Sequence, residues 1–277
     1  MKNVTVIIVA KDAEKTLPSC LNSIMDKQTL NPLEVIVVDN GSKDRTSEIA
    51  IEFGATVVKE PILGRARARN TGILKAKADL IAFTDSDCIA DRNWLFQLVK
   101  RYEQGGCVGV AGNVYALNSN RLIPKLIDRL VRDKPHYATW NIMYEKKVLL
   151  EIGLFRDFLK NAEDVDLAWR LLDKGYQIAY EPKAIVYHAH REKLFDFFYQ
   201  QFDYGKWSCV ARRSSGKSTI KANILAFIGP LTFFKHLSKA LWHPLFPFLL
   251  ALSSTAYGLG SLKGLKIWSK IRSAQYS

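Results

Sequence analysis

The feature that most constrains the fold is a series of short, nearly uninterrupted apolar runs within the first 85 residues. Runs rich in Val and Ile cover residues 4–10, 33–39, 55–60 and 80–85. Segments with helical patterns lie between them, at about residues 15–27, 44–53 and 65–77. Strands that are apolar along their whole length are buried on both faces, as in parallel sheets. The alternation therefore predicts an α/β fold built on a Rossmann-like, doubly wound sheet.

Polar residues follow each apolar run, and they include three acids that should gather at one edge of the sheet. Asp39 closes the second run, Asp85 closes the fourth, and Asp87 comes two residues later. Acids after strands are common in turns, so a D-x-D pattern alone is weak evidence. In such sheets, however, ligands bind beyond the carboxyl ends of the strands. Because clustered carboxylates repel one another, we expect a divalent cation, Mg²⁺ or Mn²⁺, at this edge.

A basic segment, "GRARARN", covers residues 64–70 at the start of the third predicted helix. The free backbone N–H groups of a helix start attract anions, and Arg65 and Arg69 share one helix face. The segment could therefore bind a diphosphate. A solvated basic face is the alternative interpretation, and we assign Arg67 to the surface.

An acidic helix start is predicted in the segment "LKNAEDVDLAWRLLDKGY", residues 159–176. Asn161 is the expected cap, and Glu163, Asp164 and Asp166 fall in the first turn. Acids at this position complement the helix dipole without any chemistry. Capping explains one or two acids better than three, so the surplus favours a chemical role.

Two histidines, His188 and His190, are two residues apart in a strand-like run and should lie on one side of it. His188 is a candidate metal ligand or donor to a leaving phosphate, and a structural role is the alternative. The four cysteines, at positions 20, 88, 107 and 209, are far apart. They predict reduced thiols in a cytosolic compartment, and neither a disulfide framework nor a zinc site.

Five segments occur in the order, and with roughly the spacing, found in inverting family 2 glycosyltransferases with an A-type nucleotide-sugar-binding fold. They are "VIIVAKDAEKTLPSCLNSI", "VIVVDNGSKDRT", "GRARARNTGI", "LIAFTDSDC" and "NAEDVDLAWRL". The chain resembles that family over about residues 3–205. The resemblance implies a mixed sheet and a UDP-, GDP- or dTDP-sugar donor. It also implies a divalent cation and an acceptor hydroxyl. We expect the acceptor to be a glycan, either lipid-linked or part of the cell envelope.

The resemblance implies a donor-binding group of four residues. Asp39 would read the nucleoside, with Asp12 closing the site, and Arg69 and Asn70 match the family's motif. The chain departs from the family at Lys11–Asp12, where an aromatic residue followed by Asn is usual. This departure affects the contact of the first loop with the base.

The resemblance also implies the metal ligands and the base. Asp87 would bind the metal directly, and Asp85 would reach the ribose or the metal through water. His188 matches a position that is often His in the family. Asp164 would be the catalytic base and Glu163 would support it, because the acidic pair of this motif supplies the base in the resembling enzymes.

The C-terminal region carries the positive charge of the chain. Eleven of the 40 Lys and Arg residues, and none of the 27 Asp and Glu residues, come after Asp203. This distribution does not indicate a nucleic-acid partner, since two uncharged apolar runs, 222–234 and 240–262, lie among these bases. We expect a catalytic domain at 1–205 and a basic, apolar helical region at 206–277.

The apolar and basic region predicts association with a membrane. Each run is short or interrupted by Pro, so a segment lying in the headgroup region is favoured over a spanning helix. The alternative is a helical subdomain that packs on the core or on a second copy of the chain. The apolar run at the N-terminus is too short for a secretory signal. These patterns predict that the protein is located at the cytoplasmic face of the cell membrane.

Two other functions fit parts of the pattern. A haloacid-dehalogenase-like phosphatase also places D-x-D after an apolar strand, but its motif is expected near the N-terminus, and here three strands precede it. A non-catalytic membrane adaptor would keep the fold for assembly. It is the weaker interpretation, because all the acids that the chemistry requires are present.

Overall fold

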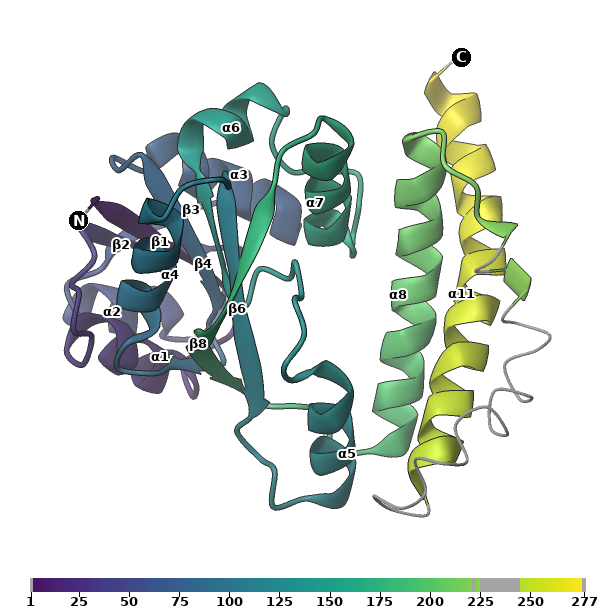
Figure 1. Cartoon of the computed structure of the whole chain (residues 1–277), viewed down its shortest axis with the longest axis horizontal. Helices are drawn as coiled ribbons and strands as arrows, with labels where there is room; N and C mark the ends of the chain where they lie inside the picture. Colours follow the sequence, from purple (N-terminus) through teal and green to yellow (C-terminus); the bar gives the residue numbers. More distant parts are fainter. Residues whose placement is uncertain (1, 221–222, 225–244, 276–277) are drawn as a thin grey trace. The chain divides into compact units, whose positions relative to one another are not determined.

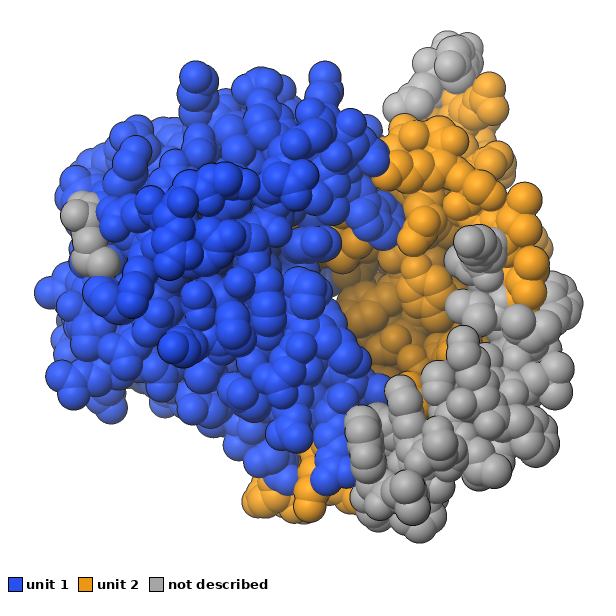
Figure 2. Space-filling model, in the orientation of Figure 1, with its two compact units in different colours: residues 1–119, 127–158, 167–190 blue, residues 120–126, 159–166, 191–277 orange. Residues whose placement is uncertain are grey.

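The computed structural model describes residues 2–220, 223–224 and 245–275 (Figure 1). The contacts divide the chain into two compact units, which are coloured separately in Figure 2. Unit 1 consists of residues 1–119, 127–158 and 167–190, and unit 2 consists of residues 120–126, 159–166 and 191–277. Each unit is described by itself.

Unit 1 contains an eight-stranded sheet with the order β3-β2-β1-β4-β7-β6-β8-β5. Its strands are β1 (Val4–Ala10), β2 (Glu34–Asp39), β3 (Thr56–Lys59), β4 (Leu80–Asp85), β5 (Cys88–Ala90), β6 (Gly109–Ala116), β7 (Ile142–Glu145) and β8 (Ile178–His188). β1 to β4 are parallel to one another. β7 is antiparallel to β4 and β6, and β5 is antiparallel to β8. The predicted α/β fold with a mixed sheet is confirmed.

The three helices predicted between the first four strands are present, and each is shorter than the predicted segment, the third only at its end. The helices of unit 1 are α1 (Leu17–Met25), α2 (Thr46–Glu52), α3 (Arg65–Lys75), α4 (Trp94–Glu103) and α6 (Lys146–Glu151). Two further helices have residues in both units: α5 (Leu122–Val131) and α7 (Glu163–Asp173). Because β1, β2 and β4 are parallel, their carboxyl ends lie at one edge of the sheet.

Two buried apolar clusters cover the two faces of the sheet. Val6 and Ile8 of β1 pack in one cluster with Trp94 of α4. Ile7, between them, packs in the other with Ile73 of α3. Successive side chains of a strand point to opposite faces, so a strand buried on both faces is apolar at every position. This explains the uninterrupted apolar runs in the sequence.

A buried asparagine connects a helix and two strands in the second half of the sheet. Asn141, fully buried just before β7, accepts a hydrogen bond from Trp94 Nε1 at 2.7 Å. Its Nδ2 donates to the carbonyl oxygens of Asn113 and Ala184, each at 2.8 Å. One buried side chain thus links α4, β6 and β8.

Unit 2 contains α8 (Leu194–Ser214) and α11 (Leu245–Gln275), which run parallel and side by side (Figure 1). Gly205 lies against the carbonyl of Tyr257, and Gly260 lies against the backbone of Phe202 and Lys206, so the two helices approach closely at glycines. The predicted domain boundary at residues 205 and 206 falls inside α8.

The apolar C-terminal runs are partly described. Residues 245–262 of the second run form part of α11, whereas most of the first run, 222–234, lies outside the described residues. Within residues 2–220, 223–224 and 245–275, no helix combines the length and the apolar character needed to cross a membrane.

Candidate functional site

Two of the predicted acids lie at the carboxyl edge of neighbouring strands. Ala10 of β1 pairs with Asp39 of β2, and Val9 of β1 pairs with Asp85 of β4. The two acids therefore flank the end of β1. The structure brings Asp39 and Asp85 to one edge of the sheet, where ligands bind in folds of this type.

Asp39 is held in a tight turn. Its Oδ1 accepts a hydrogen bond from the backbone N–H of Ser42 at 2.9 Å, and its Oδ2 accepts one from Ser47 Oγ at 2.6 Å. Burial alone would raise the pKa of Asp39, but these bonds and the charge of Lys59 outweigh it and lower the pKa. Each oxygen has a second lone pair, so the carboxylate can still accept a hydrogen bond from a ligand.

Asp12 lies against the same turn. Its backbone has a left-handed conformation with φ 49°, and its N–H donates to Ser42 Oγ at 3.0 Å. Its Oδ1 accepts a hydrogen bond from the N–H of Lys43 at 2.8 Å. These bonds join the loop after β1 to the loop after β2, and they place Asp12 and Asp39 around one short segment.

Arg69 forms an ion pair with the first acid of the D-x-D pattern. Its side chain is almost fully buried, Nη2 lies 3.4 Å from Asp85 Oδ1, and the guanidinium lies 5.9 Å from the centre of the Phe155 ring. A buried guanidinium offsets the charge of a neighbouring carboxylate. Arg69 therefore places a buried positive charge against Asp85, next to a second acid.

The other residues of the basic segment have separate roles. Asn70 donates from Nδ2 to the carbonyl of Phe155 at 2.8 Å and accepts from its N–H at 3.0 Å. This pair of bonds fixes the loop that carries Phe155, and a contact of Asn70 with a donor substrate stays a prediction. Arg67 is half-exposed and lies near Glu60 and Asp157, in keeping with the surface position assigned to it.

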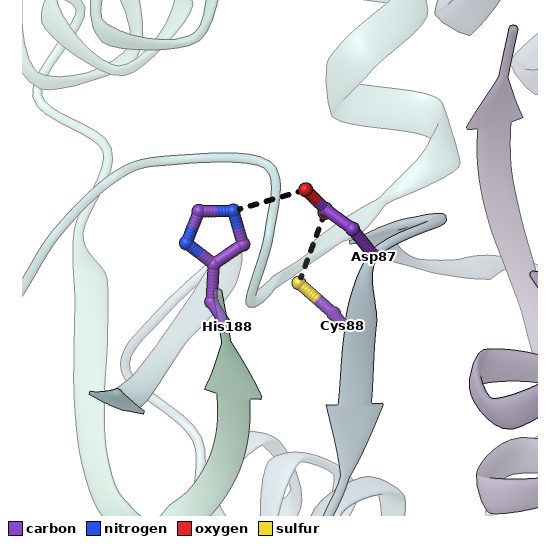
Figure 3. A group of neighbouring side chains, drawn as sticks. All are labelled: Asp87, Cys88 and His188. Atoms are coloured by element: carbon purple, nitrogen blue, oxygen red, sulfur yellow. Dashed lines mark hydrogen bonds and ion pairs between the residues drawn. The ribbon is translucent and has the colours of Figure 1, made fainter. Parts of the chain in front are cut away.

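The second acid of the pattern, Asp87, lies beside His188 (Figure 3). Asp87 Oδ2 is 3.5 Å from His188 Nε2, and Asp87 Oδ1 is 4.0 Å from Cys88 Sγ. One ligand atom from each of the three residues lies within 4.8 Å of the other two. The arrangement can hold a metal ion, because carboxylate oxygen and imidazole nitrogen both bind divalent cations.

The pairing of two strands produces this cluster. β5 is antiparallel to β8, and Cys88 lies directly opposite His188 in the register. Sequence reasoning chose Asp87 and His188 but missed Cys88. The only signal was its position after Asp87, and the pairing of β5 with β8 joins segments about 100 residues apart.

Aromatic rings surround His188. The rings of Trp140 and His190 lie 5.3 and 5.5 Å from it, centre to centre. Burial, with a smaller contribution from His188, lowers the pKa of His190 to about 4. The backbone of His190 exchanges two hydrogen bonds with the side chain of Asn118, at 2.9 and 3.0 Å. The chain after β8 is thereby fixed, and His190 is neutral near pH 7.

The predicted base lies at the start of α7, in the part that belongs to unit 2. The helix begins at Glu163, so Glu163 and Asp164 occupy its first turn. Glu163 is 3% exposed, and Asp164 Oδ1 accepts a hydrogen bond from the N–H of Val165 at 2.8 Å.

Asn161 was expected to cap α7, but its side chain makes other hydrogen bonds. Its Oδ1 accepts a hydrogen bond from the adjacent N–H of Ala162, and its Nδ2 donates to Asp203 Oδ2 of α8 at 2.8 Å. Asn161 therefore joins the segment before α7 to α8 within unit 2.

A family model described as glycosyl transferase family 2 matches residues 5–161. The pre-mycofactocin glycosyltransferase of Mycobacterium tuberculosis (strain ATCC 25618 / H37Rv) is 29% identical over 223 residues, covering 74% of this chain and 46% of that protein. Glycosyltransferase AglE of Haloferax volcanii is 29% identical over 223 residues, covering 73% and 72%. The chain thus spans about half the length of the pre-mycofactocin glycosyltransferase.

Solved structures share the fold. The mannosyltransferase PcManGT from Pyrobaculum calidifontis, in complex with GDP-Man and Mn²⁺, has a TM-score of 0.72 at 18% identity, covering 97% of this chain and 88% of that one. Glucosyl-3-phosphoglycerate synthase from Mycobacterium tuberculosis, in complex with UDP, has a TM-score of 0.61 at 20% identity, covering 78% and 81%. At these identities the likeness shows the fold alone.

Proposed function

The chain belongs to glycosyl transferase family 2, and from that premise we propose that it is a metal-dependent, inverting glycosyltransferase. It would move a sugar from a nucleoside diphosphate sugar to an acceptor hydroxyl. The observation that carries the proposal is that Asp87 lies beside His188, while Asp85, two residues earlier in the chain, forms an ion pair with Arg69. The phosphatase alternative is not favoured, because the family model covers the whole segment that contains the D-x-D pattern.

The metal site would consist of Asp87 and His188, with Asp85 acting on the ribose or through water. The donor set fits Mg²⁺ or Mn²⁺, since it offers a carboxylate and an imidazole close together at the edge of the sheet. When bound, the ion would neutralise charge on the departing nucleoside diphosphate. Structural neighbours crystallised with Mn²⁺ and a nucleotide sugar support this assignment.

The donor would bind along the loops after β1 and β2. Asp39 is fixed by Ser42 and Ser47, so it can accept hydrogen bonds from a nucleoside without reorganising. Asp12 would close this part of the site. Arg69 holds Asp85 in an ion pair at this edge. UDP-, GDP- and dTDP-sugars are all candidate donors.

The base would be Asp164, with Glu163 in support. Asp164 would take the proton of the acceptor hydroxyl as that oxygen attacks the anomeric carbon from the face opposite the nucleotide. The new bond joins the acceptor oxygen to the anomeric carbon, and the bond from that carbon to the phosphate oxygen breaks. One displacement inverts the configuration, as in inverting glycosidases, where water replaces the acceptor.

The acceptor would be a lipid-linked or cell-envelope glycan, presented at the cytoplasmic face of the membrane. Support comes from the basic C-terminal region and from exposed aromatic residues on α8, where Phe195 and Tyr199 are 75% and 59% exposed. Poly-β-1,6-N-acetyl-D-glucosamine synthase of Staphylococcus aureus (strain N315), a further relative at 23% identity, supports a glycan as the acceptor class. A second copy of the chain could bind through the same region.

The test uses the full chain with a panel of UDP-, GDP- and dTDP-sugars and Mn²⁺. We expect Asp87→Asn to abolish Mn²⁺-dependent nucleotide binding, measured by calorimetry. Asp164→Asn should retain binding and lose about 100-fold or more of the transfer rate, because it removes a general base. Equal turnover by wild type and Asp164→Asn would contradict the assigned base, and the absence of transfer with every donor would favour the adaptor.

A further inference from the structure

The centre formed by Asp87 and His188 contains a third side chain that the proposed function does not use. Cys88 Sγ lies 4.0 Å from Asp87 Oδ1, and the thiol is 1% exposed (Figure 3). All three ligand atoms lie within 4.8 Å of one another. Mg²⁺ prefers oxygen ligands, whereas a set of sulfur, nitrogen and oxygen is typical of softer ions.

We propose that Cys88 is a third protein ligand for thiophilic divalent ions, so that this centre binds Zn²⁺, Cd²⁺ or Co²⁺ in preference to Mg²⁺. The inference rests on the proposed metal site of Asp87 and His188 and extends it to a residue that no motif assigns. Its consequence is that a soft ion would displace the ion required for transfer.

The separations in the cluster suit a tetrahedral centre. With Zn–S near 2.3 Å and Zn–N and Zn–O near 2.0 Å, neighbouring ligand atoms lie about 3.3–3.5 Å apart. The distance between His188 Nε2 and Asp87 Oδ2 is 3.5 Å, and the distance between Cys88 Sγ and Asp87 Oδ1 is 4.0 Å. The first distance matches this range, the second exceeds it by about 0.5 Å, and the remaining pair lies within 4.8 Å, so adjustment of more than one side chain would close the centre on an ion.

The backbone holds two of the three ligands in register. Cys88 and His188 are direct partners in the antiparallel β5–β8 pair. Side chains at such positions lie on the same face, with Cβ atoms about 4.5–5.5 Å apart. Cys88 is also part of the buried core cluster, which limits its movement. The sulfur is therefore placed toward the centre before any ion binds.

The chemistry of the thiol explains the preference between ions. Sulfur is a soft ligand that favours Zn²⁺, Cd²⁺ and Co²⁺, whereas Mg²⁺ favours hard oxygen ligands. On binding a soft ion, the S–H bond breaks and the proton passes to water. A sulfur–metal bond replaces a metal–water bond, and nothing is oxidised or reduced.

The test is a titration of the metal-free full chain with Co²⁺, followed by ultraviolet and visible absorption. We expect wild type to develop a saturable thiolate-to-cobalt charge-transfer band, and Cys88→Ser to lack it. The affinity of Cys88→Ser for Cd²⁺ should fall about tenfold or more, while its affinity for Mg²⁺ should change less. Cys107→Ser is the matched control, because Cys107 is a more accessible thiol outside the cluster, and it should keep the band.

Binding of Mn²⁺, measured by electron paramagnetic resonance on the same preparations, separates the two proposals. A wild type that binds Mn²⁺ but shows no charge-transfer band overturns the role of Cys88 and leaves the proposed function standing. A band that persists in Cys88→Ser also overturns it. A wild type that binds neither Mn²⁺ nor Co²⁺ overturns both proposals. The absence of a band in wild type overturns the role of Cys88 by itself, so the proposal stays falsifiable if Cys88→Ser does not fold.

Discussion

At the scale of single residues, each acid at the edge of the sheet has its own local partner. Asp85 pairs with buried Arg69, Asp87 lies beside His188, and Asp39 accepts hydrogen bonds from Ser42 and Ser47. These different partners offset the repulsion between like charges at one edge. Because the same contacts limit the movement of the carboxylates, less conformational freedom is lost when a ligand binds.

Ser47→Ala tests the contribution of these partners. The pKa of Asp39 lies below its usual value, so the stabilisation that it provides is present above an unfolded pKa of about 3.9 and is lost as the pH falls through the folded pKa. Removing the hydroxyl should reduce this shift. We expect Ser47→Ala to be about 1 kcal/mol less stable to urea than wild type at about pH 7, and closer to wild type at about pH 3.

Ser19→Ala is the control for this comparison, because Ser19 is exposed on α1 and should leave the stability unchanged at both pH values. An equal loss of stability at both pH values in Ser47→Ala would contradict a role through the ionised carboxylate.

Asn141→Ala tests the buried link between the strands. The substitution leaves Trp94 Nε1 and the carbonyls of Asn113 and Ala184 without their partner in a buried setting. We expect a loss of about 2–4 kcal/mol in the free energy of unfolding, measured with denaturant. Asn22→Ala, at a partly exposed position on α1, should change the stability by about 0.5 kcal/mol or less. Similar losses in both variants would contradict the role of Asn141.

At the scale of elements, burial on both faces decides what the sequence could predict. β1 and β4 begin and end at the predicted residues, because their apolar runs stop where the strands leave the core. β5 has three residues and was not predicted, since so short an edge strand has no periodicity of its own. It forms by pairing with β8, and this long-range contact is not encoded in any local pattern.

The candidate site was predictable to the same extent. Asp39, Asp85 and Asp87 could be identified because they follow buried strands, and His188 because it ends a strand-like run. Cys88 could not, because its role depends on the β5–β8 register. Asn161 was expected to cap α7, but it donates to Asp203 of α8, a partner that only the folded chain supplies.

Gly260→Ala tests the close approach of α8 and α11. A methyl group at residue 260 would clash with the carbonyl of Phe202 and lie 2.8 Å from the backbone nitrogen of Lys206. Backbone atoms cannot give way as a flexible side chain can, so the helices must separate. We expect thermal unfolding, followed by circular dichroism, to begin at a temperature several degrees lower, equivalent to about 1–3 kcal/mol.

Ser269→Ala on the exposed side of α11 is the control, and it should leave the transition in place. A Gly260→Ala variant as stable as wild type would show that the two helices do not pack as described.

At the scale of the whole molecule, charge is strongly segregated along the chain. The first 203 residues carry 29 basic and 27 acidic residues, whereas the rest carry eleven basic residues and no acidic ones. Such a distribution leaves the catalytic segment nearly neutral, so it would not repel an anionic nucleotide sugar or attract it strongly. It concentrates the attraction for anionic surfaces in the C-terminal region.

Three exposed lysines on α11 allow this attraction to be measured. Lys263, Lys266 and Lys270 are three and four residues apart, so they share one helix face. Each should contribute about 1 kcal/mol at an anionic bilayer, so replacing all three with Gln should weaken binding to phosphatidylserine-containing vesicles by about 100-fold. The measurement is co-sedimentation of the full chain with vesicles, and added salt should weaken the wild-type binding because it screens exposed charges.

A triple variant at exposed lysines of unit 1 (Lys27, Lys75 and Lys100, each to Gln) removes the same charge and should bind like wild type. If the two triple variants bind equally, net charge and not the α11 face drives the association, and if wild type does not prefer anionic to neutral vesicles, the proposed membrane surface is wrong.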